Sequence, residues 1–225
     1  MRLLVVAVEG QWISSLMQAL RRSGHSVDRV SDTEDAVNAL LAHDFQLLIA
    51  DLSPAQRRDA EPLRRLRGMQ PAVTIVALAA GDGDGERIRA LDAGADDCIA
   101  APHSIAEIEA RVRVWARRSF GSTTPLVQHG PLSYDAAARV AYLEDRPLRL
   151  SPREISVLEL LLQRVGRPVS KGQFADRLFQ WGEEVSCNAI EASICRLRRK
   201  LGSGPVRIST MRGVGYSLEG SRRAS

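Results

Sequence analysis

The first half of the chain alternates short apolar runs with segments of helical periodicity. The apolar runs span residues 3–8, 27–30, 47–50, 73–78 and 98–100, and the helical segments span 12–23, 33–43, 61–68, 84–93 and 104–118. Strands that are buried on both faces give continuous apolar runs, so five strand–helix units predict a parallel sheet covered by helices on both sides. The active crevice of such an α/β domain lies at the carboxyl ends of its strands, where Asp51 directly follows the third run.

The second half carries signals for three helices and a terminal hairpin. Ser151 with Glu154, and Ser170 with Gln173, form capping boxes that open the first two helices. We expect Asn188 to cap the third helix, with Glu191 three residues on completing a third capping box. Its apolar residues recur on one stripe, Ile190, Ile194, Leu197 and Leu201. Glycines at 213 and 215 between alternating apolar positions indicate a hairpin, and the whole pattern is typical of a winged helix-turn-helix domain.

The face of the third helix opposite this stripe is short-chained and cationic. It consists of Asn188, Ala189, Ala192, Cys195, Arg196 and Arg199. Such a face suits the major groove of DNA, although many basic amphipathic helices are simply solvated. The basic excess is local, because residues 119–225 hold 16 Lys or Arg against 10 Asp or Glu, whereas residues 1–118 hold 15 against 17. A basic face binds phosphates without reading sequence, so charge alone indicates DNA binding and leaves specificity open.

Residues 126–220 resemble the DNA-binding domain of OmpR/PhoB-type response regulators. The resemblance rests on the segments LSPREISVLELLL, GRPVSKGQFADRLF, SCNAIE, RLRRKLG and RGVGY. It implies that Arg196 reads bases in the major groove and that Arg212, in the wing, enters a minor groove. It also implies phosphate contacts from a further set, which is Trp181, Asn188, Arg198 and Thr210. Arg199 shares the cationic face and is a further candidate for DNA contact.

Residues 1–118 resemble the receiver domain of the same regulators, which has a flavodoxin-like fold. The segments DFQLLIADLSP and LDAGADDCIAAPHSIAEIEARVR carry the resemblance, and Asp51 matches the phosphoacceptor aspartate. The rest of the family's pocket is replaced. The metal-binding acidic pair falls on Ala7 and Val8, the switch hydroxyl on Ala79, and the phosphate-pairing lysine on Ala101.

These replacements remove the groups that phosphoryl transfer needs. Mg²⁺ requires one or two carboxylates, and a cation must neutralise the charge of the transferring group. We therefore expect a vestigial Asp51 and control that does not depend on a cognate histidine kinase. Two alternatives stay open. One is a conventional regulator phosphorylated on Asp51 with help from a rearranged Glu9. The other is a sensor whose apolar pocket, lined by Ala7, Val8, Ala79 and Ala101, binds a small molecule or protein.

The face that these regulators use for pairing is retained in the sequence. The charged positions of the fourth helix, fifth strand and fifth helix match Arg87, Asp96, Asp97, Glu107 and Arg111. A two-fold interface is self-complementary, so Arg87 of one chain can meet Glu107 of its partner. The alternative is that these are ordinary surface charges, each worth little.

Length and composition agree with a DNA-binding regulator of two domains. The chain has 225 residues, of which 44% are hydrophobic, and it has three scattered cysteines without zinc or disulfide spacing. We expect a receiver-like domain at 1–118, a linker at 119–125, a winged helix at 126–220 and a tail at 221–225. The expected protein is cytoplasmic, is not an enzyme, and needs no metal or cofactor. Its expected partners are double-stranded DNA, a second copy of itself and RNA polymerase, with no membrane.

Overall fold

The computed structural model describes residues 1–53, 60–118, 126–179 and 187–220. The chain forms two compact units, Met1–Val112 and Arg113–Ser225, and the division falls within helix α5 (Ile105–Arg118). The linker and the tail expected from the sequence lie outside the described residues. The domain ends at 118 and 126 therefore stay predictions.

The N-terminal unit contains the five expected strand–helix units, each with ends within about two residues of the prediction. Its strands are β1 (Arg2–Val6), β2 (Ser26–Val30), β3 (Leu47–Asp51), β4 (Thr74–Leu78) and β5 (Asp97–Ile99). Its helices are α1 (Gln11–Arg22), α2 (Thr33–Ala42), α3 (Glu61–Met69), α4 (Asp84–Asp92) and α5. All strands are parallel in the order β2-β1-β3-β4-β5, so the predicted sheet is confirmed.

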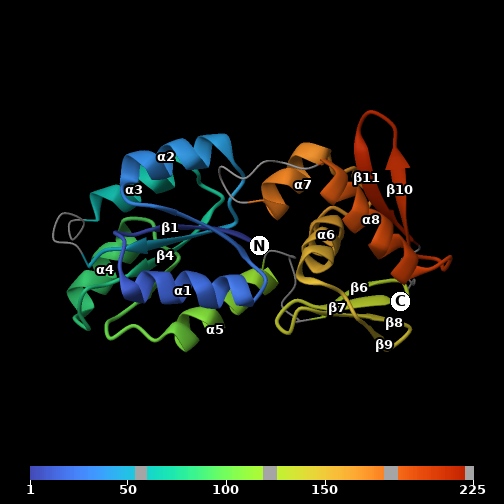
Figure 1. Ribbon diagram of the computed structural model, residues 1–225. Helices are drawn as coiled ribbons and strands as arrows, with labels where there is room; N and C mark the ends of the chain where they lie inside the picture. The colour runs from blue at the N-terminus through green and yellow to red at the C-terminus, as the bar shows by residue number, and fades with distance from the viewer. Residues whose placement is uncertain (54–59, 119–125, 180–186, 221–225) are drawn as a thin grey trace. The chain divides into compact units, whose positions relative to one another are not determined.

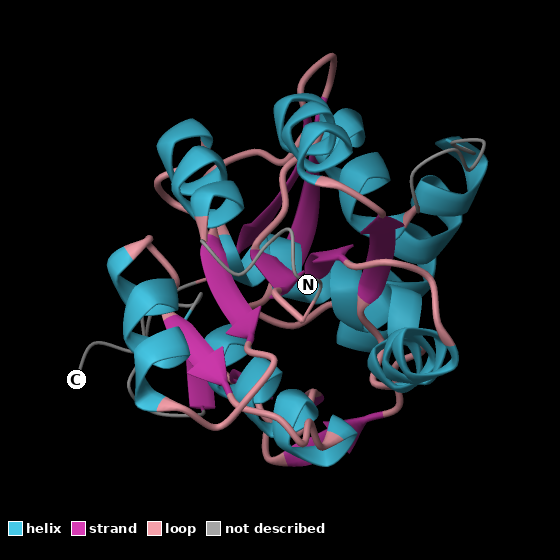
Figure 2. Ribbon diagram, turned by 90° about the vertical axis from the view of Figure 1, so that its left-hand side faces the viewer, coloured by secondary structure: helices cyan, strands magenta, loops and turns pink. Residues whose placement is uncertain are grey.

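Helices cover both faces of this sheet (Figure 1, Figure 2). Leu4, Leu48 and Ile75 pack in one core with Leu63 of α3 and Ala90 of α4. Figure 1 shows α2 and α3 on one side of the strands and α1 and α5 on the other. Because side chains alternate along a strand, a strand covered on both faces is apolar at successive positions, as β1, β3 and β4 largely are, whereas the edge strand β2 also holds Asp28 and Arg29.

The C-terminal unit begins with a four-stranded antiparallel sheet in the order β6-β7-β8-β9. Its strands are β6 (Leu126–His129), β7 (Leu132–Asp135), β8 (Val140–Leu143) and β9 (Arg146–Leu148). Three helices follow, α6 (Pro152–Gln163), α7 (Lys171–Leu178) and α8 (Cys187–Leu201). The hairpin of β10 (Arg207–Met211) and β11 (Gly215–Glu219) ends the unit and forms the wing. The winged helix-turn-helix predicted from the sequence is therefore confirmed.

Two of the three expected capping boxes are present. The Ser151 hydroxyl accepts a hydrogen bond from the Glu154 backbone N–H, and the Ser170 hydroxyl accepts one from the Gln173 backbone N–H. In return, the side chains of Glu154 and Gln173 each accept a hydrogen bond from the backbone N–H of the serine. The third was wrong, because α8 begins at Cys187 and Asn188 lies inside it. A residue inside the helix already has helical backbone angles, so it cannot occupy the capping position.

A buried ionic cluster ties the first sheet of the C-terminal unit to its helices. Glu159 of α6 accepts a hydrogen bond from the Tyr134 hydroxyl at 2.5 Å, and Arg139 and Arg177 lie 3.2 and 3.5 Å from its carboxylate. Burial and the neighbouring carboxylate raise the pKa of Tyr134, so its hydroxyl stays a donor. The cluster joins β7, α6 and α7, and removing one charge would leave another buried without compensation.

Candidate DNA-binding surface and strand-end residues

Helix α8 presents the two faces that its sequence predicts. The apolar stripe is buried, since Ile190, Ile194 and Leu197 are at most 1% exposed. Arg196 and Arg199 on the opposite face are exposed. The remaining candidates on this face, Asn188 and Cys195, are exposed as well, whereas Trp181 lies outside the described residues. The helix therefore offers a row of solvent-facing polar and cationic side chains on a buried apolar support.

Two ion pairs hold α8 in place. Lys171 at the start of α7 lies 2.6 Å from Glu191, and Lys200 lies 2.6 Å from Glu154, the buried capping residue of α6. Lys200 also donates to the Arg149 carbonyl at 2.7 Å. A lysine at the end of a helix is ordinarily a solvated charge that suits the negative end of the helix dipole, but Lys200 is engaged on both counts. Its pairing depends on how α6 and α8 pack, which no local pattern encodes.

Arg198 connects α8 to the wing. Its Nε donates to the Ile208 carbonyl at 2.9 Å and its Nη2 donates to the Thr210 hydroxyl at 2.6 Å. The guanidinium also lies 5.6 Å from the centre of the Tyr216 ring. Two of the predicted phosphate contacts, Arg198 and Thr210, are thus neighbours, and these hydrogen bonds fix the orientation of the arginine.

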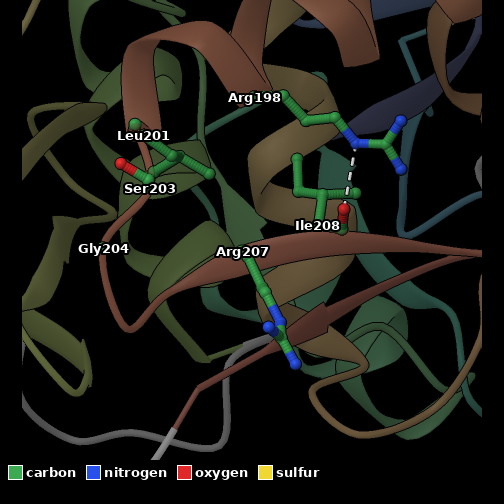
Figure 3. A pocket seen from close by; sticks show the side chains of 7 residues that line it. Arg198, Leu201, Ser203, Gly204, Arg207 and Ile208 are labelled. Carbon is green, nitrogen blue, oxygen red and sulfur yellow. Dashed lines mark hydrogen bonds between the residues drawn. The ribbon is translucent and has the colours of Figure 1, made fainter.

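A hollow of about 320 Å³ lies beside Arg198 where α8 meets β10 (Figure 3). It is lined by Arg198, Leu201, Gly202, Ser203, Gly204, Arg207 and Ile208. Figure 3 shows Arg198 reaching the Ile208 carbonyl, while Arg207 extends in a different direction. Arg207 lies 3.2 Å from Glu219 on the neighbouring strand. The cations at this hollow therefore already have partners within the unit.

The base of the wing is joined to the segment before α7. Val169 and Tyr216 exchange two backbone hydrogen bonds of 2.7 and 2.9 Å. Next to them Gly215 has a φ of +148°, and a Cβ there would lie 1.9 Å from the Val169 carbonyl oxygen. The close approach of the two backbones therefore requires glycine at 215, and it holds the wing against the helices.

The carboxyl ends of the sheet in the N-terminal unit carry the expected apolar positions. Ala7 and Ala79 are buried, Ala101 is half-buried, and Val8 is 55% exposed. Asp51 ends β3, is half-buried, and accepts a hydrogen bond from the Ser53 backbone at 2.9 Å. This carboxylate thus supports the turn that follows its strand.

Arg29 is a residue of this edge that sequence reasoning missed. It lies in β2, where its Nη1 donates to the Ala7 carbonyl at 3.1 Å and its Nη2 lies 3.5 Å from the Glu9 carboxylate. A fixed cation therefore contacts the position where the family's metal-binding pair would begin. Only the register of β2 against β1 brings Arg29 there, so a linear motif could not have revealed it.

The charges expected at the pairing face are largely engaged within the chain. Arg111 lies 2.6 Å from Asp97 and 2.9 Å from Glu107. Asp96 accepts from the Ile75 backbone at 2.8 Å and lies 2.6 Å from Arg67 of α3. Arg87 on α4 is exposed. The sequence predicted these positions as a dimer interface and did not indicate that three of them pair across elements of one unit.

The described segments contain no group of three or more His, Cys, Asp or Glu side chains that could hold a metal ion. In the same segments, no helix is both long and apolar enough to cross a membrane.

Comparisons with known proteins agree with both units. Residues 4–113 match the family described as "Response regulator receiver domain", and residues 145–218 match "Transcriptional regulatory protein, C terminal". The response regulator protein PmrA of Pseudomonas aeruginosa is 38% identical over 200 residues, covering 89% of this chain and 90% of its own. The probable transcriptional regulatory protein y4xI of Sinorhizobium fredii is 36% identical over 203 residues, with 89% and 90% covered. Among solved structures, the response regulator DrrB, an OmpR/PhoB homologue of Thermotoga maritima, aligns over 97% of this chain and 99% of its own, at 23% identity and a TM-score of 0.47.

Proposed function

The chain belongs to the OmpR/PhoB family of response-regulator transcription factors, and on that premise we propose that it binds repeated DNA half-sites as a dimer without needing aspartyl phosphate. Arg196 reads base edges in the major groove, and Arg198, Arg199 and Thr210 hold phosphates. These contacts combine sequence readout with a salt-dependent electrostatic contribution.

The side chains at the strand ends of the N-terminal unit are the main support for control without phosphorylation. Ala7 and Val8 supply no carboxylate for Mg²⁺, and Ala101 supplies no cation for a phosphate. Glu9, the remaining carboxylate of that loop, lies 3.5 Å from the Arg29 guanidinium. A metal ion at Glu9 would have to displace this ion pair, which adds to the support for a receiver that works unmodified.

The conventional alternative is phosphorylation on Asp51, which the position of this residue at the end of β3 favours. Incubation with acetyl phosphate and Mg²⁺, followed by intact-mass analysis, distinguishes control without phosphorylation from phosphorylation on Asp51. We expect no stoichiometric phosphate adduct on the wild-type chain. Asp51→Asn, which lacks the acceptor carboxylate, is the matched control.

The same sample should then be titrated against a duplex that the full chain selects from a random library. Unmodified protein should already bind this duplex, and Asp51→Asn should stay within about threefold of wild type, which is less than roughly 0.7 kcal/mol. A stoichiometric adduct that tightens DNA binding would restore the conventional regulator.

Dimer formation is proposed through α4, β5 and α5. Arg111 already bridges Asp97 and Glu107 in one chain, so assembly would exchange or extend these ion pairs. Such exchange adds little net energy, because exposed pairs are individually weak, but it selects the partner and the register. Sedimentation velocity across a concentration series measures whether the unmodified chain associates.

A further inference from the structure

The tip of the wing exposes two apolar side chains on either side of its arginine. Met211 is 44% exposed and Val214 is 49% exposed, and Arg212 between them is exposed as well. The Val214 backbone donates to the Met211 carbonyl at 3.0 Å, and Gly213 has a φ of +75°, so the four residues form a tight turn. Turns at hairpin tips are usually polar, which makes this pair of exposed apolar side chains unusual.

The register of the hairpin explains why nothing in the wing covers Met211. Thr210 pairs with Tyr216, whose ring is buried, and Met211 pairs with Gly215, which has no side chain. Since neighbouring residues of a strand point to opposite faces, Met211 lies on the face away from Tyr216. The hydrogen bonds between Val169 and Tyr216 hold the base of the hairpin, so the tip presents this side chain from a fixed support.

Resting on the proposed function, we propose that Met211 is a specificity-determining residue that packs, together with Val214, inside an A·T-rich minor groove of DNA. Charge selects this partner, since Arg212 at the same tip is attracted to the strong negative potential of a narrow A·T groove. The apolar side chains support the same partner, because minor-groove proteins combine such cations with apolar side chains, methionine among them, that insert between base steps. A guanine would place its 2-amino group on the groove floor, where the thioether sulfur is only a weak acceptor for it and the group would lose its water.

The test uses a duplex selected by the full chain from a random library. Hydroxyl-radical footprints are recorded for wild type and for Arg212→Ala. The base pairs that wild type protects and Arg212→Ala does not are those under the wing. These pairs are then made A·T, G·C or inosine·C in three otherwise equal duplexes. Inosine lacks the 2-amino group, so inosine·C keeps the major-groove pattern of G·C and resembles A·T in the minor groove.

Wild type should bind the A·T and inosine·C duplexes about tenfold more tightly than the G·C duplex, as expected for a base pair that is read directly. Met211→Ala should weaken binding to the A·T duplex about fivefold and reduce the preference to within about twofold. Met211→Leu should retain the preference, because it keeps an apolar chain of similar size. Leu41→Ala, which removes a 65% exposed leucine from α2, is the matched control and should behave as wild type.

Each other outcome has a defined meaning. If Met211→Ala keeps the wild-type preference for A·T and inosine·C, or if it loses self-association instead of DNA discrimination, this inference is overturned and the proposed function stands. If wild type enriches no duplex from the library, the proposed function fails, and the inference fails with it.

Discussion

Replacing Gly215 by alanine should detach the wing from the helices that support it. The new Cβ would lie 1.9 Å from the Val169 carbonyl oxygen, 2.7 Å from its carbonyl carbon and 2.9 Å from the Ser170 Cα. All three are backbone atoms, so no side-chain rotation relieves the clash. The hairpin has to move, and the two hydrogen bonds between Val169 and Tyr216 lengthen or break.

The expected cost follows from these contacts. Losing two backbone hydrogen bonds costs about 0.5–1.5 kcal/mol each, and holding alanine at a φ that suits only glycine costs about 1–3 kcal/mol. The sum, about 2–6 kcal/mol, is a large part of the 5–15 kcal/mol that stabilises a typical domain. Tyr216 would be displaced as well, and the centre of its ring lies 5.9 Å from the centre of the Phe174 ring.

Gly213→Ala is the matched control. Gly213 has a φ of +75°, but a Cβ there meets no atom within 4 Å. Only the backbone strain applies, which is about 1–2 kcal/mol.

Hydrogen exchange read by mass spectrometry in a urea series follows the two units of the full chain separately. Peptides from β10, β11 and α6 should lose protection at lower urea in Gly215→Ala, while peptides from β1 to β5 should not change. Equal midpoints for the two glycine variants would show that the contact with Val169 carries no stability.

Three further predictions concern DNA, assembly and pH. Arg196→Ala should cost about 1–3 kcal/mol on the selected duplex and less on random DNA, and a fluorescence-anisotropy titration showing equal losses would contradict base reading. Reversing the charge of Arg87 or of Glu107 should weaken dimerisation in sedimentation velocity, and reversing both should restore part of it, whereas unchanged single variants would remove this interface. Burial acts to raise the pKa of Glu154, but Lys200 and a backbone N–H lower it below the ordinary 4.5. The stability that the ionised carboxylate contributes should therefore be complete above pH 4.5 and be lost as the pH falls through the lowered pKa, and urea midpoints of Glu154→Gln should lack this acid-side loss.

The sequence predicted the elements and their buried faces because these depend on periodicity along the chain. The stripe of α8 from Ile190 to Leu201 is an example, since helical spacing alone placed it in the core. The capping boxes at Ser151 and Ser170 were predictable for the same reason, because all their groups lie within one turn.

The interactions that the sequence could not predict join residues that lie far apart in the chain. Arg29 reaches the Ala7 carbonyl through the register of two strands, and Lys200 reaches Glu154 through helix packing. Asp96 was predicted as part of an interface, and its contact with Arg67 depends on where α3 lies against the sheet. The N-cap of α8 was misplaced at Asn188, because a capping box is recognised only by residue type and a spacing of three, and Asn188 and Glu191 have that spacing inside the first turn.

The guanidinium of Arg29 also bears on how the protein responds to its surroundings. Unlike a bound Mg²⁺ ion, a side chain of the protein cannot be chelated, diluted or exchanged. A ligand stabilises a fold only if it binds the native state more tightly than the unfolded state, so neither EDTA nor millimolar Mg²⁺ should shift the melting temperature of the N-terminal unit. On the proposed function, the active population of the regulator would be set by its own abundance, through mass action, and not by metal supply or a phosphodonor pool.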